Sequence, residues 1–232
     1  MNPLPEVLAF DVFGTVVDWH GSIAREVDAM ALGVDGQEFA SAWRAGYRPA
    51  MDRVRRGELG WTKIDDLHRM ILDTVLEGFG VTALDEAARR HLNLVWHRLE
   101  PWPDAVAGLQ RLKRRFRICT LSNGNLGLLA DMAKRGGLPW DLILSAEVFR
   151  HYKPDPEAYL GVAEVFDVDP SRVMLVAAHK DDLAGAQRCG LATAFVERPR
   201  EFGKAQRDDL GRDHPFDLHA TDFEDLASQL GC

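Results

Sequence analysis

Basic residues are in deficit in this chain of 232 residues, because 28 Lys and Arg are outnumbered by 36 Asp and Glu and the formal net charge is −8. A protein that binds nucleic acid through its phosphates needs a dominant basic face, so we expect no nucleic-acid partner. A local basic cluster, Arg53, Arg55 and Arg56, is better interpreted as the solvated face of a helix than as a phosphate site.

Cysteine is also scarce, and long apolar runs are missing. The three cysteines, Cys119, Cys189 and Cys232, show no pairing pattern and no metal-ligand spacing, which favours a reduced, cytoplasmic compartment. No run approaches the roughly 18 apolar residues that cross a membrane. The first residues lack a basic segment and include Asp11 in their apolar stretch, so we expect no signal peptide and no membrane partner.

Short apolar runs, continuous rather than alternating, are typical of strands that are covered on both faces. They are Val7–Phe10, Arg117–Leu121, Leu142–Ser145, Val173–Ala177 and Thr193–Val196. Helical patterns occupy the gaps around the later strands, at Asp104–Arg114, Leu126–Arg135, Pro156–Phe166 and Asp182–Cys189. This alternation predicts an α/β fold with a Rossmann-like, doubly wound parallel sheet. Ligands bind beyond the carboxyl ends of the strands in such sheets.

The interval between the first two strands is too long for a single crossover helix. Apolar residues recur there at helical spacing in four stripes: Ile23, Val27 and Met30; Phe39, Trp43 and Tyr47; Leu67, Met70, Ile71 and Val75; Leu92, Val95, Trp96 and Leu99. We interpret these stripes as core packing. They predict a four-helix cap domain, residues 19–99, inserted into a core domain of residues 1–18 and 100–232. The stretch 101–103, Pro-Trp-Pro, is expected to form the hinge between them.

Polar residues that could take part in catalysis follow four of the predicted strands. Asp11 follows the first strand, Ser122 and Asn123 end the second, Lys153 follows the third and Asp182 follows the fourth. Because the carboxyl ends of parallel strands share one edge of a sheet, we expect these side chains to converge. Each alone is typical of a turn or a helix cap, but their joint occurrence in this order predicts one active site with Asp11 as the nucleophile.

This set resembles the haloacid dehalogenase superfamily, over nearly the whole chain. Members carry an aspartate nucleophile, a Ser/Thr, a Lys and an acidic loop in that order, and most are magnesium-dependent phosphatases. Their first motif reads Asp-x-Asp, and their last places a metal-binding Asp four residues before a second one. Phe13 and Ala178 occupy these two positions here. Because a phenyl ring donates no proton and a methyl group binds no Mg²⁺, both residues disfavour phosphoryl transfer.

Within the superfamily, the closer resemblance is to the type II L-2-haloacid dehalogenases, which need no metal. Their motifs correspond here to Phe13–Thr15, Leu121–Gly124, Lys153–Pro156 with Tyr159, and the pair Trp43 and Arg44. The resemblance implies a hydrolytic dehalogenase that converts short 2-haloacids to 2-hydroxy acids and releases halide, without a metal or other cofactor. Related enzymes are commonly dimers, so the resemblance also allows a homodimer.

The chemistry is coherent without the family. Asp11 is expected to attack C2 of a 2-haloacid and form an alkyl ester, which water would then hydrolyse. No general acid is needed, because halide is already a good leaving group. Arg44 offers a permanent cation for the halide, and the resemblance implies that it also contacts the substrate. Phe13 is expected to help to keep the site dry. Lys153 is expected to lower the pKa of Asp11 and keep it ionised.

Other residues have expected supporting roles. Ser122, Asn123 and backbone N–H groups near Leu126 would hold the substrate carboxylate. Tyr159 either faces the same site or packs in the core. Thr15 is expected to support the turn of the nucleophile through a hydrogen bond between its hydroxyl and the backbone.

The fourth loop, residues 177–182, departs from the dehalogenase pattern of roughly Ser-Ser-Asn-x-Trp-Asp and reads Ala-Ala-His-Lys-Asp-Asp. Asp182 keeps the acidic position and is the candidate for orienting or deprotonating the hydrolytic water. His179 replaces an amide, and either acts as a base or bonds to backbone. Asp181 replaces an aromatic residue that walls the pocket. Two alternatives stay open: a magnesium-dependent phosphatase using Asp181 or Asp182, and a catalytically silent relative that binds an organic acid.

Overall fold

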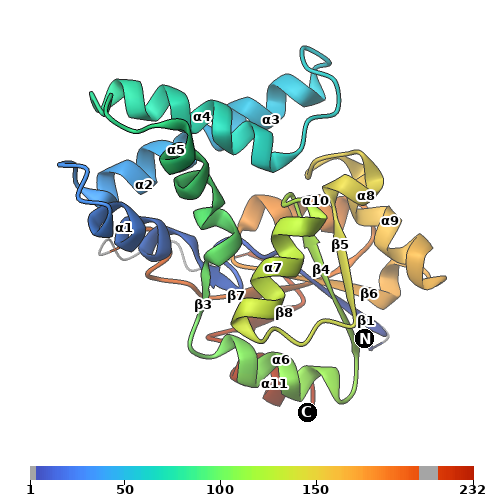
Figure 1. Cartoon of the computed structure of the whole chain (residues 1–232). Coiled ribbons are helices and arrows are strands. Elements are labelled where there is room, and N and C mark those ends of the chain that lie inside the picture. Colours follow the sequence, from blue (N-terminus) through green and yellow to red (C-terminus); the bar gives the residue numbers. More distant parts are fainter. Residues whose placement is uncertain (1–3, 204–213) are drawn as a thin grey trace.

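A parallel sheet forms the centre of the protein (Figure 1). The computed structural model describes residues 4–203 and 214–232, and within these ranges the sheet has six strands in the order β5-β4-β1-β6-β7-β8. The strands are β1 (Val7–Phe10), β4 (Arg117–Ser122), β5 (Leu142–Ser145), β6 (Val173–Ala177), β7 (Ala192–Val196) and β8 (Leu218–Ala220). β1 is central, so the residue that follows it lies at the middle of the carboxyl edge.

Helices cover both faces of this sheet, which confirms the predicted doubly wound α/β fold. Leu8 and Phe10 of β1 belong to the core on the face covered by α6 (Ala105–Lys113), α7 (Leu126–Gly136) and α11 (Phe223–Gln229). Val7 and Ala9 belong to the core on the face of α9 (Pro156–Phe166) and α10 (Lys180–Arg188), next to the short α8 (Ala146–Phe149). Burial on both faces explains why the strand is apolar throughout.

The strand β8 has no counterpart among the five predicted strands. Its three residues, Leu218–Ala220, pair with β7 at the edge of the sheet, and its middle residue is His219. A three-residue run with a polar centre carries too little periodicity to be recognised from sequence. A short 3₁₀ helix, η2 (Pro170–Arg172), precedes β6 and is likewise absent from the predictions.

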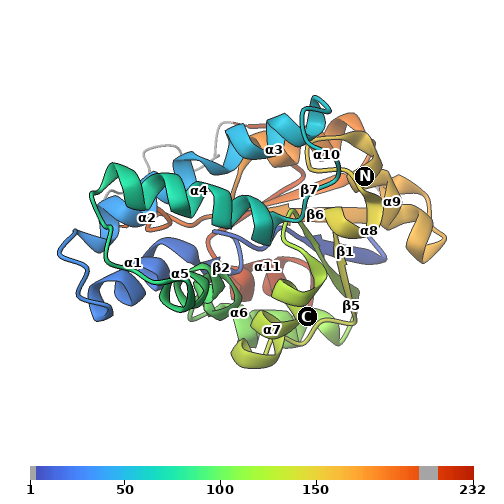
Figure 2. The same cartoon turned by 45° about the horizontal axis from the view of Figure 1, so that its top comes forward.

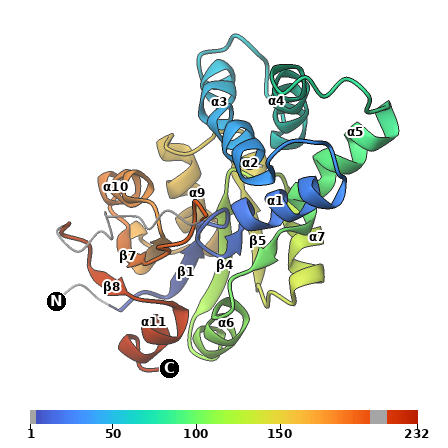
Figure 3. The same cartoon turned by 90° about the vertical axis from the view of Figure 1, so that its left-hand side faces the viewer.

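The part of the chain between residues 19 and 99 is mostly helical and lies above the sheet (Figures 1 and 3). It contains α1 (Trp19–Ala29), α2 (Gly36–Ala45), α3 (Tyr47–Arg55), α4 (Ile64–Gly78), α5 (Glu86–Asn93) and the 3₁₀ helix η1 (Leu94–Arg98). We refer to residues 19–99 as the cap. No helix in the described ranges is long and apolar enough to cross a membrane.

The cap differs from the predicted four helices because the second and fourth stripes are each divided. Tyr47 was expected to continue the helix of Phe39 and Trp43, but α2 ends before Gly46 and α3 begins after it. A Cβ at Gly46 would collide with the side chain of Ile71, so the glycine allows α4 to pack closely against the bend. The fourth stripe runs through α5 and then η1, whose tighter 3₁₀ winding no apolar pattern distinguishes.

The chain enters and leaves the cap through a two-stranded antiparallel ribbon. β2 (Val17–Asp18) pairs with β3 (Glu100–Pro101), with Val17 opposite Pro101. Trp102, within the predicted hinge stretch, donates its backbone N–H to Val16 and its indole N–H to the carbonyl of Gly14, at 2.9 and 3.0 Å. The two crossings are therefore joined to each other and to the turn that follows β1.

Contacts between the cap and the core continue over the carboxyl edge of the sheet, where α3 and α4 lie across the molecule (Figure 2). Arg55 of α3 donates two hydrogen bonds to Asp155 at 2.7 and 2.9 Å. The hydroxyl of Tyr152 donates to the carbonyl of Thr62 at 2.6 Å. These contacts hold the cap over the carboxyl ends of the strands.

Candidate active site

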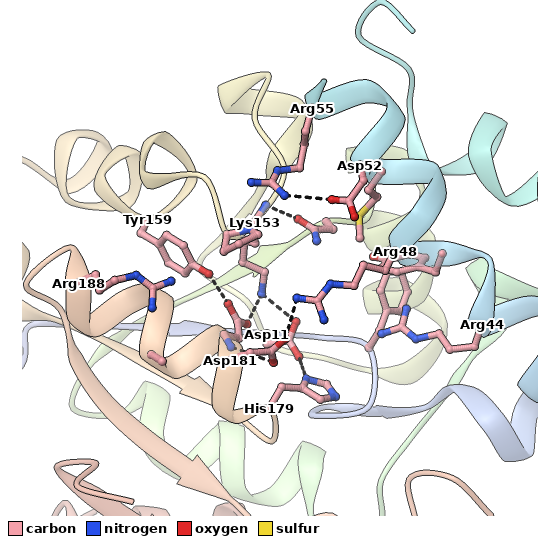
Figure 4. A pocket seen from close by; sticks show the side chains of 17 residues that line it. Asp11, Arg44, Arg48, Asp52, Arg55, Lys153, Tyr159, His179, Asp181 and Arg188 are labelled. Atoms are coloured by element: carbon pink, nitrogen blue, oxygen red, sulfur yellow. Dashed lines mark hydrogen bonds and ion pairs between the residues drawn. The ribbon is translucent and has the colours of Figure 1, made fainter. Parts of the chain in front are cut away.

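A cavity of about 410 Å³ lies between the cap and the carboxyl edge of the sheet (Figure 4). The core contributes side chains that follow β1, β4, β5 and β6, and the cap contributes side chains of α2 and α3. Its lining includes Asp11, Phe13, Asn123, Lys153, Tyr159, His179 and Asp182 from the core, and Arg44, Tyr47, Arg48 and Arg55 from the cap. Most of the residues predicted from sequence therefore meet in one place.

Asp11 is the most extensively bonded carboxylate of the cavity and is only 7% exposed. Its Oδ1 accepts a hydrogen bond from Lys153 Nζ at 2.9 Å, and its Oδ2 accepts one from the Thr15 hydroxyl at 2.8 Å. His179 Nδ1 lies 3.0 Å from the same Oδ2. Burial alone would raise the pKa of Asp11, but the charges of Lys153 and His179 outweigh it and hold the pKa well below its ordinary value. Asp11 is thus ionised.

Thr15 connects the nucleophile to the fourth loop. Its hydroxyl donates to Asp11 and accepts the backbone N–H of Ala178 at 2.9 Å. The hydroxyl does bond to the backbone, but its backbone partner belongs to a loop 163 residues away rather than to the turn of the nucleophile. Thr15 therefore orients Asp11 directly.

Lys153 lies between two carboxylates and is 8% exposed. Its Nζ donates to Asp11 and, at 2.5 Å, to Asp182 Oδ2. Its backbone N–H donates to the side-chain oxygen of Asn123 at 2.8 Å, which anchors the loop after β5 to the loop after β4. Burial opposes the charge on Lys153, yet the two carboxylates raise its pKa above the ordinary value, so it remains an ammonium group.

Both carboxylate oxygens of Asp182 accept hydrogen bonds from protein side chains. Its Oδ2 accepts from Lys153, and its Oδ1 accepts the hydroxyl of Tyr159 at 2.7 Å. This bond resolves the open choice for Tyr159, which faces the site. Because both oxygens of Asp182 bind protein donors, the geometry supports a role in orienting Lys153 more than the predicted deprotonation of water.

His179 lies between two carboxylates, and only one of them was anticipated. Its Nδ1 faces Asp11, and its Nε2 lies 2.8 Å from Oε1 of Glu201. Burial would lower the pKa of His179, but the charges of Glu201 and Asp11 raise it to about 10. Among the described residues, then, the ring bonds to side chains, which favours the first of the two roles considered for His179. Sequence reasoning missed Glu201, because it lies in the loop after β7 with no motif around it.

The cap side of the cavity is aromatic and carries Arg44. The guanidinium carbon of Arg44 lies 4.0 Å from the ring centroid of Tyr47 and 5.4 Å from that of Trp19. Its Nη1 is buried and has no hydrogen-bond partner among the described residues. Phe13 is buried and contacts Tyr47 edge to face, with centroids 6.3 Å apart. A buried guanidinium N–H without an acceptor, in apolar surroundings, is suited to bind a small anion.

The predicted anion contacts at the start of α7 are not free in the structure. Ser122 is fully buried, accepts the N–H of Gly124 and does not line the cavity. The backbone N–H of Leu126 donates to Glu147 at 2.7 Å. Asn123 does line the cavity, so it remains the one member of this predicted set in position to contact a substrate.

Arginines of α3 form the cavity rim and were not predicted as site residues. Arg48 lies 3.3 Å from Asp181, whose side chain is 69% exposed, and Arg55 binds Asp155. The prediction of a solvated helix face fits Arg56, which pairs with Glu58, but not Arg55. Arg48 and Arg55 are seven residues apart on α3, and this helical spacing could have identified the face.

The donors at this site fit a metal poorly. Asp11 and Asp182 both bind the ammonium group of Lys153, which holds the position between the two carboxylates. Ala178 offers no ligand from the fourth loop. Within residues 4–203 and 214–232, no group of three His, Cys, Asp or Glu side chains is arranged to hold a metal ion.

Comparisons with known proteins agree with this geometry. Residues 5–190 match the profile of the haloacid dehalogenase-like hydrolases. (S)-2-haloacid dehalogenase 1 of Pseudomonas sp. (strain CBS-3) is 31% identical over 88% of this chain and 91% of its own length. A solved defluorinating L-2-haloacid dehalogenase is 46% identical, covers 98% of this chain and 96% of its own, and superposes with a TM-score of 0.94. A second solved L-2-haloacid dehalogenase is 46% identical over 98% of this chain and 100% of its own, with a TM-score of 0.93.

Proposed function

Because this chain belongs to the haloacid dehalogenase-like hydrolases, we propose that it is a hydrolytic dehalogenase of short 2-haloacids that uses an aspartyl ester and no metal. The observation that carries the proposal is the pairing of an ionised, buried Asp11 with the unpartnered guanidinium N–H of Arg44 across one cavity. The first group attacks carbon, and the second receives an anion.

In the proposed reaction, one carboxylate oxygen of Asp11 attacks C2 of the haloacid and forms a carbon–oxygen bond as the carbon–halogen bond breaks. The electron pair of that bond leaves with the halide, which Arg44 receives. Phe13 and Tyr47 exclude water from the reacting carbon, so the carboxylate is less solvated and more nucleophilic. Water then hydrolyses the ester, which yields the 2-hydroxy acid and restores Asp11.

Lys153 and Thr15 hold the nucleophile in this reaction. Each donates to a different oxygen of Asp11, so the carboxylate plane is fixed before the substrate binds. Asp182 and Tyr159 fix Lys153 in turn, and Asn123 fixes its backbone. We propose that Asn123 also contacts the substrate carboxylate, because it lines the cavity.

Halide release is the direct test of this function. We expect the purified protein to release chloride from chloroacetate and 2-chloropropionate and bromide from bromoacetate, at rates unchanged by EDTA, because no step uses a metal. Both enantiomers of 2-chloropropionate belong in the panel, as does fluoroacetate, since one of the 46% identical relatives is a defluorinating enzyme. Ion chromatography measures the halide.

Loss of activity on chelation would contradict the metal-free reaction. Hydrolysis of p-nitrophenyl phosphate that requires Mg²⁺ and Asp11, without halide release, would identify the protein as a phosphatase instead. Binding of haloacids without any turnover would identify a silent organic-acid-binding relative.

Replacement of the proposed halide acceptor gives a second test. We expect Arg44→Met to reduce kcat/KM for chloroacetate about a hundredfold or more, which is the usual effect of removing one preorganised donor to a developing anion. Arg44→Lys keeps the charge but loses the planar group, so an intermediate rate is expected. Steady-state halide release measures both variants.

Arg48→Met is the matched control, because Arg48 lines the same cavity but pairs with the exposed Asp181. An exposed ion pair of this kind is worth at most about 1 kcal/mol, so we expect less than about a fivefold change. Equal losses in the Arg44 and Arg48 variants would indicate general attraction of anions by the rim rather than a halide site.

We also propose a division of the chain into a core of residues 1–18 and 100–232 and a cap of residues 19–99, supported by the ribbon at both crossings. A cytoplasmic location is proposed from the unpaired cysteines. A homodimer is proposed only because related dehalogenases are commonly dimers, and analytical ultracentrifugation would test it.

A further inference from the structure

A fully buried carboxylate, Glu201, lies behind His179 and has no role in the proposed attack on C2. Its side chain is 0% exposed, and its Oε1 faces Nε2 of His179 at 2.8 Å. The same oxygen accepts the indole N–H of Trp19 at 3.1 Å. Gly14, with φ +85°, leaves room for this carboxylate, because a Cβ there would collide with it. The site is thus built around Glu201.

Acidic and basic side chains alternate in a series of buried contacts that runs from Glu201 through His179, Asp11 and Lys153 to Asp182. Figure 4 shows His179 on one side of Asp11 and Lys153 on the other. In the free enzyme His179 is an imidazolium, because the carboxylates on its two sides raise its pKa against the effect of burial. Burial would raise the pKa of Glu201, but the charge of His179 lowers it, and Arg44 of the cap adds to this effect, so Glu201 stays ionised.

Ester formation at Asp11 changes this balance. The ester is neutral, so one of the two charges that stabilise the imidazolium disappears, while burial continues to favour the neutral ring. The pKa of His179 therefore falls at this stage of the reaction. The neutral ring donates its Nε2–H to Glu201 and leaves Nδ1 unprotonated on the side of Asp11.

We propose that His179 is the general base of the ester-hydrolysis step and that Glu201 is its positioning residue. The inference rests on the proposed function, since it needs the aspartyl ester. Asp182, the base expected from sequence, is less suited, because both of its oxygens accept hydrogen bonds from protein donors. Glu201 selects the tautomer of His179 that can accept a proton from water.

The protons balance over one turnover. When the halide leaves, His179 loses one proton to solvent. The ring then takes a proton from water as the hydroxide oxygen bonds to the carboxyl carbon of Asp11, and it returns that proton to the departing alkoxide of the 2-hydroxy acid. Asp11 is left as a carboxylic acid and passes its proton to His179, which restores the ion pair. The net products are one hydroxy acid, one halide and one proton.

Burst kinetics with chloroacetate separate the two steps. In Glu201→Gln and His179→Asn we expect chloride release of one equivalent per active site near the wild-type rate, followed by turnover that is slower by about a hundredfold, the usual contribution of a general base. Intact-protein mass spectrometry of the quenched reaction should show the ester in both variants. Glu164→Gln, on an exposed position of α9, is the matched control and should turn over as the wild type does.

A role that is merely structural would slow the chloride burst and the steady state together and would leave no ester, so that result overturns the inference. A wild-type rate in Glu201→Gln would also overturn it. If the wild type itself releases no halide, the proposed function fails and the inference fails with it. Halide release by the wild type together with variants that lack the burst would remove the His179–Glu201 role alone.

Discussion

Asp11→Asn is expected to lose halide release by about 10⁴-fold or more, the scale seen when a covalent nucleophile is removed. The amide has nearly the same size as the carboxylate and keeps one oxygen that can accept a hydrogen bond from Lys153 or from Thr15, so the fold should be preserved. An amide oxygen is nevertheless a poor nucleophile toward an alkyl halide. Chloride release from chloroacetate, measured beside the circular dichroism spectrum, tests this expectation.

Asp181→Asn is the matched control, because this neighbouring carboxylate is exposed at the cavity rim, where it pairs with Arg48. Its Oδ1 also accepts the backbone N–H of Asp182, a hydrogen bond that the amide oxygen of asparagine can keep. Its activity should stay within about fivefold of the wild type. A single turnover of the wild type in H₂¹⁸O adds an independent readout, since one label should enter Asp11 before any enters the product. Label that enters the product directly would contradict the ester.

Lys153→Met is expected to lose both activity and stability. Removal of the ammonium leaves Asp11 and Asp182 as two buried carboxylates without their shared partner, and breaking a buried ion pair in this way costs about 3–5 kcal/mol. Unfolding in urea measures this loss. Burial then raises the pKa of Asp11, so the residual activity should increase as the pH rises.

The loss of stability should itself depend on pH. In the wild type the pKa of Asp11 is lowered on folding, so its contribution to stability is present above the pKa of the unfolded chain and is lost as the pH falls toward the folded value. The variant lacks this contribution. The difference between the two proteins should therefore be largest near neutral pH and shrink in acid. Lys134→Met, at an exposed position of α7, should change neither quantity.

A constant difference in stability at every pH would show that Lys153 stabilises the fold by packing alone. Full activity in Lys153→Met would contradict its role in keeping Asp11 ionised. The two readouts are independent, because the first reports the buried charges and the second reports the nucleophile.

Much of the fold could be predicted because burial determines the pattern of the strands. Val7–Phe10 is apolar at every position since both faces of β1 are covered, and the same holds for β6. The predicted boundaries of these two strands match the structure. The break at Gly46 could not be predicted, because it depends on the close approach of Ile71 from another helix.

The site shows the same limit. Asp11, Lys153, Asp182 and Tyr159 converge because each is close to the carboxyl end of a parallel strand or the helix that follows it, and this is a rule of topology. Glu201 could not be found in this way, since it meets Trp19 across 182 positions of the sequence. The N–H groups near Leu126 were expected to be free, but the carboxylate of Glu147 in α8 already accepts one of them, and sequence spacing does not report such competition.

The ribbon formed by β2 and β3 has a consequence for how enzymes of this kind diversify. The cap begins and ends at neighbouring, hydrogen-bonded positions, with Asp18 opposite Glu100. An insertion whose two ends lie side by side can be lengthened, shortened or exchanged without moving the strand that precedes the nucleophile. Arg44 and Tyr47 would be replaced along with the cap, whereas Asp11 and Lys153 would stay. The sequence of the cap can therefore evolve toward new leaving groups while the core keeps its chemistry.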